Sequence, residues 1–594
     1  MIESIIFIIS FMWVAAGLLL YPRREQRENV VTIIPVVVLT ILCIQMIGVL
    51  ILEKLSIAIT LKSSMWILIL VGSGLWLGII RRKKFQALIC PWRDVLLLGL
   101  AMMIVLMEAF HMFAGVSRLS YRNDDAQAFF GMAQQVVRGK TLQGLYNGTY
   151  FNAYMNALLI ELGQPWLRMV DTYKMFILGD VLIHLLEIGI FYSVLAKLCR
   201  QKAVRCFLPV ICLFYFLGYP TYSFMSGNFI YWSTGGVLFL YLIYSLIGLQ
   251  NRWEERWCYY GMLAFGIFGS VVCNRLYAII NPLCMLFALF CIIMEKKHLL
   301  VGKSRKLVFS LVLAVVGVVV VLSHNRIWNL LMLICERLQD DGANYAVLYK
   351  EIVLFIPVVI CLVVYGYRNK IASPIVGVIS VPVILISAGM LWLCVQKYIS
   401  VYYYYKIYYC LWIVMWLMAV TVLDTLIQEG HGFYVLSYAS FVICLALNQP
   451  LVESETGDNN YFLMYRDNLK CFQMDYAGQE LQQSGRYTPK KLLDDYQYLA
   501  DQYCADGICF LSDSGNYMQG RWFATILNSS EEVYYSIYSS VVEYYLSGAV
   551  PYSYIVMGKQ SGIYGESIAL LNDINIEYED EMIVVVRTNY GKEY

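Results

Sequence analysis

The stretch VTIIPVVVLTILCIQMIGVLIL, residues 31–52, contains no charged residue. A helix needs about 20 consecutive apolar residues to cross the hydrocarbon core of a bilayer, and this run is long enough. The whole chain follows the same trend, because it is 60% hydrophobic and only 14% charged, with a mean hydropathy of +0.62. Soluble domains carry about 25% charged residues. The composition therefore predicts a polytopic α-helical membrane protein.

Apolar runs of similar length recur along the chain and are separated by short polar breaks. From them we expect about 12–14 transmembrane helices. The runs lie at about residues 4–20, 31–52, 65–80, 94–115, 174–196, 206–220, 232–249, 257–273, 276–294, 307–323, 351–367, 374–395, 404–422 and 433–449.

The basic residues predict the orientation of these helices. Clusters such as RRKK, residues 81–84, fall in alternate loops, and cytoplasmic loops are the ones that carry an excess of Lys and Arg. One predicted inner loop, DTLIQEGHG at 424–432, lacks basic residues. The pattern places both termini outside. It divides the chain into N-terminal helices (1–115), an extracytoplasmic loop (116–173), a helical core (174–449) and an extracytoplasmic region (450–594).

The last region differs in composition from the rest of the chain. It is polar, and its strand-like runs GICFLSD (507–513), YSYIVMGK (552–559) and EMIVVVRTNY (581–590) follow the helix-like PKKLLDDYQYLADQY (489–503). Such alternation predicts an α/β domain of about 140 residues on the outer face. Cys504 and Cys509 lie close together there, and two interpretations stay open: a disulfide or two buried thiols.

An acidic pair stands out in the long outer loop, in SYRNDDAQAFFGMAQQVVRG, residues 120–139. After Asp124 and Asp125, apolar residues recur at helical spacing and Gly139 closes the run; they are Phe129, Phe130, Met132, Ala133, Val136 and Val137. This spacing predicts an amphipathic helix in the membrane surface with both acids at its N-terminus. The acids either cap the helix, or one acts as a general base or binds a divalent cation.

This stretch resembles the first external loop of the GT-C superfamily, the multi-spanning glycosyltransferases that use polyprenyl-phosphate sugars. The matching positions are the acidic pair Asp124–Asp125, the aromatic Phe129 and the glycine Gly139. The layout is also similar to that of protein O-mannosyltransferases and aminoarabinose transferase-like enzymes. Two features depart from the pattern: about three additional spans precede the loop, and Phe129 stands where the family often has Tyr.

The resemblance implies an inverting transfer of a sugar from a polyprenyl-phosphate donor to a cell-envelope glycan, lipid or protein. Asp124 would be the general base, and Asp125 would assist it. Both would bind the metal if a divalent cation such as Mg or Mn takes part. The implied location is the plasma membrane, among its lipids, with the active site on the extracytoplasmic face. The net charge of +2 gives no indication of nucleic-acid binding.

Other polar residues are candidates for the same site. A donor phosphate needs cations, and those predicted near the outer face are Arg275, Arg326, Lys397 and Lys406. Each of them would also suit a lipid interface. The supporting candidates are Glu108, His111, His324, Asp340 and Asp341.

Alternative functions remain open from the sequence. One is an envelope polysaccharide polymerase or ligase, although acids rather than Arg and His dominate the outer loops. Another is a lipid-sugar flippase or secondary transporter, which the intramembrane residues Asp180, His184 and Glu187 favour. Those three residues also suit simple mutual pairing within the bundle. The two similar halves typical of many transporters are not visible. A non-enzymatic scaffold is the last alternative.

Overall fold

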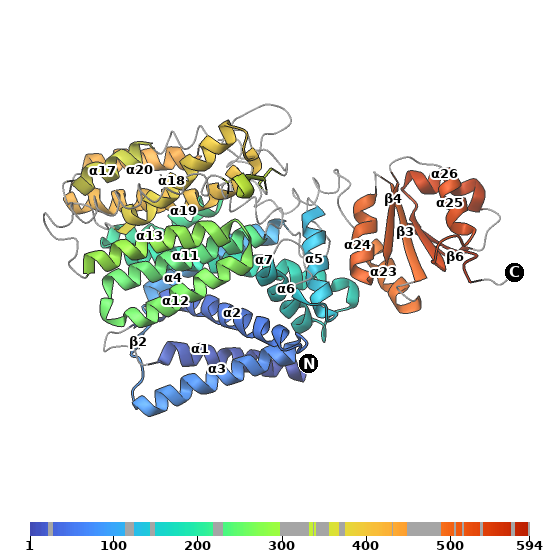
Figure 1. Cartoon of the computed structure of the whole chain (residues 1–594), viewed down its shortest axis with the longest axis horizontal. Coiled ribbons are helices and arrows are strands. Elements are labelled where there is room, and N and C mark those ends of the chain that lie inside the picture. Colours follow the sequence, from blue (N-terminus) through green and yellow to red (C-terminus); the bar gives the residue numbers. More distant parts are fainter. Residues whose placement is uncertain are drawn as a thin grey trace.

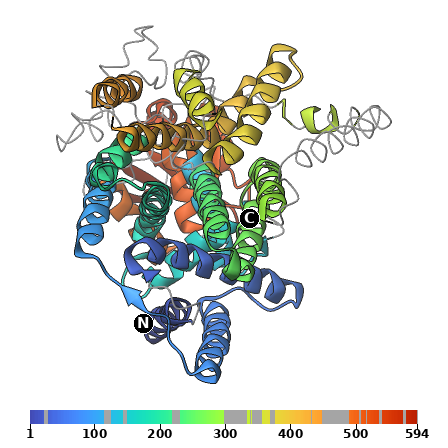
Figure 2. The same cartoon turned by 90° about the vertical axis from the view of Figure 1, so that its left-hand side faces the viewer.

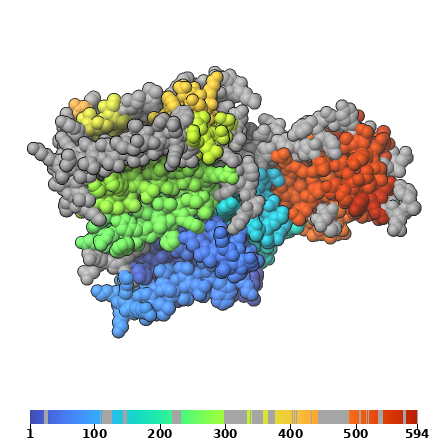
Figure 3. Space-filling model, in the orientation of Figure 1, coloured from blue at the N-terminus to red at the C-terminus, as the bar shows by residue number. Residues whose placement is uncertain are grey.

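The computed structural model of the chain describes most of the 594 residues (Figures 1 and 3). The described ranges are 1–21, 28–112, 124–142, 149–217, 230–296, 329, 332–336, 338–339, 356–367, 375–430, 432–447, 489–503, 507–513, 516–534, 539–571 and 576–591. Two parts follow one another along the chain, a bundle of long helices and a region built around a β-sheet.

Long apolar helices make up the first part. In chain order they are α1 (Ile2–Leu20), α2 (Val30–Lys54), α3 (Leu61–Arg82), α4 (Trp92–Met112), α7 (Tyr173–Leu198), α9 (Leu208–Leu217), α11 (Ile230–Asn251), α12 (Arg256–Cys273), α13 (Tyr277–Lys296), α17 (Ile356–Tyr367), α18 (Ile375–Val395), α19 (Val401–Glu429) and α20 (Gly432–Leu447). Shorter elements connect them: α5 (Asp124–Val137), α6 (Tyr150–Gly163), the 3-10 turn η4 (Met169–Asp171), α8 (Lys202–Cys206), β1 (Glu28–Asn29) and β2 (Leu88–Ile89).

Eight helices in the described ranges are long and apolar enough to cross a membrane: α1, α2, α3, α7, α11, α13, α18 and α19. The expected polytopic helical architecture is confirmed at this level. The described part of the predicted run at 94–115 is helical, as α4, and so is the run at 257–273, as α12. In the described part of the run at 206–220 lies the ten-residue α9, and the run at 307–323 lies outside the described residues.

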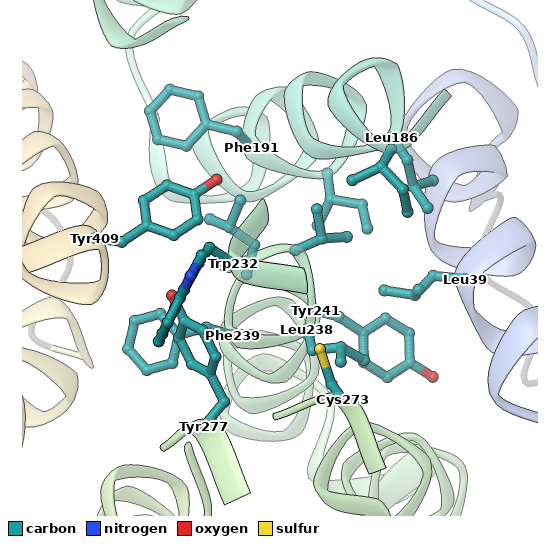
Figure 4. Packing of buried hydrophobic residues seen from close by; sticks show 14 of the residues in the cluster. Leu39, Leu186, Phe191, Trp232, Leu238, Phe239, Tyr241, Cys273, Tyr277 and Tyr409 are labelled. Atoms are coloured by element: carbon teal, nitrogen blue, oxygen red, sulfur yellow. The ribbon is translucent and has the colours of Figure 1, made fainter. Parts of the chain in front are cut away.

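Helix α11 forms the centre of the bundle, and its whole apolar window is buried. It packs against α7, α12, α13 and α19. Two adjacent glycines permit this contact, because a Cβ atom on Gly235 or Gly236 would overlap the ring of Tyr277 or Tyr409, respectively. Small residues allow membrane helices to approach closely in this way. Figure 4 shows the resulting aromatic packing, with Trp232 of α11 beside Tyr277 and Tyr409.

The helix contacts define two ends of the bundle. At the first, which we call the α5 end, Gln134 of α5 donates a hydrogen bond to Thr172, the residue before α7 (3.1 Å). At the other, the β1–β2 end, Asp424 near the C-terminus of α19 accepts bonds from the backbone N–H groups of Arg200 and Gln201, beyond the C-terminus of α7. Helices α7 and α19 therefore both run from the α5 end to the β1–β2 end.

The C-terminal region contains a five-stranded mixed sheet in the order β4-β3-β5-β7-β6. Its strands are β3 (Ile508–Asp513), β4 (Ser530–Tyr534), β5 (Tyr554–Gly558), β6 (Ile576–Glu579) and β7 (Ile583–Arg587). Strand β3 is parallel to both β4 and β5, whereas β7 is antiparallel to β5 and β6. The strand-like runs noted in the sequence are β3, β5 and β7. Cys509 is a buried free thiol in β3, and Cys504 lies outside the described residues.

Helices cover the sheet from both faces. Residues of α23 (Lys490–Gln502) and α24 (Tyr517–Leu527) pack with Phe510, Val556 and Val585 on one face. Residues of α25 (Ser539–Leu546) and α26 (Gly562–Leu571) pack with Leu511, Met557 and Val586 on the other. The alternation of inward side chains along β3 and β5 produces these two separate cores. In the end-on view of Figure 2 the sheet lies behind the bundle, and α24 contacts α5.

Candidate functional site

Helix α5 carries the acidic motif and begins at Asp124, as the sequence predicts. It ends at Val137, and Gly139 follows with φ of +84°, a left-handed conformation that glycine adopts without strain. Figure 1 shows α5 lying across the end of the bundle, roughly perpendicular to the long helices. The acidic pair therefore stands at the N-terminus of a transverse helix at the α5 end.

The surroundings of α5 correct one expectation. Its apolar face was expected to rest in the membrane surface, yet Ala126, Phe130, Ala133 and Val136 are buried by protein. The ring of Phe130 lies 5.5 Å from that of Phe176 in α7 and 5.6 Å from that of Trp522 in α24. Helix α5 thus lies between the bundle and the C-terminal sheet and packs against apolar side chains of both.

Polar contacts reinforce this junction. The Gln127 amide donates to Thr525 Oγ1 of α24 and Arg138 Nη2 donates to the carbonyl of Ile526. Immediately before η4, the Arg168 guanidinium contacts Asp494 Oδ1 of α23 at 2.9 Å. The C-terminal sheet is therefore fixed to the end of the bundle where the acidic motif lies.

Several candidate side chains are not described. This holds for the side chains of Asp124, Asp125, Glu108 and His111, although their backbones lie in α5 and α4. His324, Arg326, Asp340 and Asp341 lie outside the described residues altogether. Among the side chains that are described, no group of three or more His, Cys, Asp or Glu residues has the arrangement of a metal site. A metal role for Asp124 and Asp125 stays a prediction.

The remaining candidate cations occupy different environments. Arg275 and Lys397 are exposed, and Lys397 has a φ of +62° in the turn before α19. Lys406, in contrast, is half-buried in α19. Its Nζ lies 4.2 Å from the ring centroid of Trp232 and 5.0 Å from that of Tyr403. Of the three candidate cations whose side chains the structure describes, Lys406 is the one that lies inside the bundle, and its ammonium faces aromatic rings.

A polar network lies next to Lys406 in the interior of the bundle. It centres on Asp180, His184 and Glu187, which follow one another along one face of α7 and are fully buried. His184 Nδ1 lies 3.0 Å from Glu187 Oε2, and His184 Nε2 lies 3.6 Å from Asp180 Oδ1. The pairing that the sequence left open is therefore present between His184 and Glu187, whereas the Asp180 carboxylate approaches His184 without a hydrogen bond through Oδ1. Rising about 1.5 Å per residue, α7 places the trio roughly 10–21 Å from its first residue, Tyr173.

Neighbouring helices complete the network with groups that the sequence did not single out. The phenols of Tyr215 in α9 (2.6 Å) and Tyr409 in α19 both donate to Glu187 Oε1. The Ser233 hydroxyl of α11 lies 3.2 Å from His184 Nε2. Spacing along one helix revealed the trio, but no local signal reveals which tyrosines of other helices reach it.

The network and the cation are adjacent. Tyr409 lies three residues after Lys406 on α19, so both occupy nearly one face, one turn apart. Trp232, under the Lys406 ammonium, immediately precedes Ser233 on α11. The ring of Trp232 also lies 5.5 Å from that of Tyr277. Lys406 therefore lies one helical turn to the α5 side of the contact between Tyr409 and Glu187.

This arrangement suits two kinds of chemistry. A half-buried ammonium beside aromatic rings is suited to bind an anionic or sugar-bearing group from the membrane. Linked buried carboxylates, an imidazole and hydroxyls are suited to hold or relay a proton, and ionisable groups within membrane spans usually serve a function. Comparison with models of known protein families finds no match, and comparison with curated proteins finds none either.

Proposed function

We propose that the protein is a membrane glycosyltransferase of GT-C type that transfers a sugar from a polyprenyl-phosphate carrier to a cell-envelope acceptor. The observation that carries the proposal is the position of α5, which begins at Asp124, lies across one end of an apolar bundle and contacts α24. A carboxylate there meets a donor held in the membrane and an acceptor that arrives from water.

In this reaction Asp124 accepts the proton of an acceptor hydroxyl, and the oxygen of that hydroxyl attacks the anomeric carbon of the donor sugar. The bond from that carbon to the carrier phosphate breaks, and the polyprenyl phosphate leaves with the bonding electrons. Attack from the face opposite the phosphate inverts the anomeric configuration. Asp125 orients the acceptor. We place the active site, with α5 and the C-terminal sheet, on the extracytoplasmic face of the plasma membrane.

Lys406 is our choice for the donor phosphate contact. It is half-buried and its ammonium lies over Trp232, whereas Arg275 and Lys397 are exposed. A phosphate beside Lys406 would have the aromatic rings of Trp232 and Tyr403 next to the sugar or the first isoprene unit.

The test is sugar transfer by purified protein in liposomes, with radiolabelled polyprenyl-phosphate hexoses as donors and cell-envelope extract as acceptor. General base catalysis contributes about 10²–10⁴-fold, so Asp124→Asn should lose transfer by a factor in that range. Asp501→Asn, which changes an exposed acid of α23, is the matched control and should retain full transfer. Wild-type transfer by folded Asp124→Asn would refute the proposed base.

The buried Asp180–His184–Glu187 network supports a second candidate, a proton-coupled transporter of lipid-linked sugars. Its test uses the same liposomes without acceptor. A transporter moves intact donor across the bilayer and responds to a pH gradient, while a transferase leaves the donor where it was. Donor movement that Glu187→Gln abolishes would favour this candidate.

A further inference from the structure

A polar pocket of about 260 Å³ lies at the β1–β2 end, far from α5. The ends of four long helices and the short helix α8 meet there. Its charged and amide side chains are Glu28, Asn29, Asp94, Lys197, Arg205 and Arg252. Three are basic and two are acidic, so the pocket carries an excess of positive charge.

The basic residues of the pocket differ in their contacts. Arg252 Nη1 forms an ion pair with Glu28 Oε1, and the Asn29 amide donates to Asp94 Oδ2. Lys197 Nζ lies 3.8 Å from the ring centroid of Tyr244, and Arg205 Nε donates to the Cys199 carbonyl at 2.9 Å. These last contacts are with neutral groups. They hold both cations in the pocket, which also contains the Asp94 carboxylate.

An apolar groove of about 170 Å³ adjoins the polar pocket. Glu28 lines both, and helix α2 contributes Thr32 to the pocket and Val36 to the groove. Tyr244 of α11 lines the groove and lies under Lys197 of the pocket. Helices α2 and α12 form the walls through Val36, Val37, Met262 and Phe265, and Trp257 at its rim is 75% exposed. A charged pocket is thus continuous with an apolar groove.

We propose that this pocket and groove bind one anionic phospholipid. The phosphate lies between Lys197 and Arg205, and one acyl chain lies in the groove between α2 and α12. Basic pockets between transmembrane helices recognise lipid phosphates, and each buried CH₂ of a chain contributes about 0.8 kcal/mol. The bilayer supplies such lipids directly to a site at the end of the helices. The proposal is independent of the α5 end and of the glycosyltransferase function.

Two variants test the two halves of the site separately. Arg205→Gln removes a charge from an exposed side chain of the polar pocket, and Arg200→Gln is its control because Arg200 is also exposed but does not line the pocket. Gly261→Leu extends a side chain into the groove, where a Cβ atom meets nothing within 4 Å. Its control is Gly389→Leu in α18, where a Cβ atom is equally unobstructed and which does not line this groove.

The experiment is native mass spectrometry of the full chain in detergent, titrated with phosphatidylglycerol, together with thermal unfolding in the same lipid or in inorganic phosphate. We expect Arg205→Gln and Gly261→Leu each to weaken lipid binding about tenfold, the equivalent of about 1.4 kcal/mol, and both controls to bind like wild type. Gly261→Leu without lipid should unfold no earlier than wild type, because replacing a helical glycine favours the helix. Wild-type lipid binding by both test variants would overturn the proposal. Equal stabilisation by inorganic phosphate alone would also overturn it, since that ligand has no chain.

Discussion

The ring of Phe130 in α5 lies 5.6 Å from the ring of Trp522 in α24, and both side chains are buried. This pair joins the helix that carries the acidic motif to the C-terminal sheet. Because α5 contacts both the bundle and α24, the position of the sheet and that of the motif depend on one another.

Replacing Phe130 with Ala tests this dependence. Truncating a fully buried Phe typically costs 3–5 kcal/mol, and here the loss falls on the junction. We expect faster amide hydrogen exchange in α5 and α24 and little change in α11. Phe85→Ala, at a side chain that is 67% exposed, is the control and should leave exchange unchanged. If amide exchange in α24 of the Phe130→Ala variant were as slow as in wild type, the junction would not depend on this ring.

Glu187 accepts hydrogen bonds from two phenols and pairs with His184, so its removal should be costly. Glu187→Ala leaves buried polar groups without an acceptor, which should destabilise the bundle by about 3–5 kcal/mol. Glu187→Gln keeps a carbonyl oxygen for the phenols and should cost less than half as much. Thermal unfolding in one detergent compares the two. Equal losses would mean that the carboxylate charge, rather than the acceptor geometry, holds the network together.

Lys406 should determine donor affinity if its ammonium contacts the carrier phosphate. A hydrogen bond to a charged group contributes about 1.5–3 kcal/mol, so Lys406→Gln should raise KM for the polyprenyl-phosphate donor by roughly 10–100-fold. Transfer kinetics in liposomes measure this effect. The exposed Lys397→Gln is the control and should keep the wild-type KM. A smaller rise for Lys406 than for Lys397 would exclude Lys406 as the main phosphate contact.

Much of the helical architecture was predictable because spanning helices need long apolar runs, and such runs are local features of sequence. Residues 31–52, for example, lie within α2. The start of α5 at Asp124 and the turn at Gly139 were also predictable, since helix caps depend on a few adjacent residues.

Contacts between distant segments were not predictable in the same way. The sequence suggested lipid as the surface under α5, but Phe130 packs against Phe176 and Trp522 instead. An amphipathic face indicates that something apolar covers it and does not indicate what. Likewise Tyr215 and Tyr409 look like ordinary aromatic residues of apolar helices, and only packing brings their phenols to Glu187.

Glu531 in β4 should make the stability of the C-terminal sheet depend on pH. Burial raises the pKa of its carboxyl from 4.5 to about 7, although Arg521 opposes the shift. A raised pKa means that folding favours the protonated form. Its stabilising effect is complete below about pH 4.5 and is lost as the pH rises through about 7. The side chain is 22% exposed, so the effect should be on the order of 2 kcal/mol.

Glu531→Gln should remove this dependence. The amide cannot ionise, so the variant sheet should be as stable as wild type near pH 4.5 and more stable at pH 8. Hydrogen exchange of β3 and β4, corrected for intrinsic rates, measures the difference at each pH. Glu566→Gln, at an exposed acid of α26, is the matched control and should follow wild type at both values. If β3 and β4 of Glu531→Gln lost protection at pH 8, the ion pair with Arg521 would outweigh the cost of burying the carboxylate.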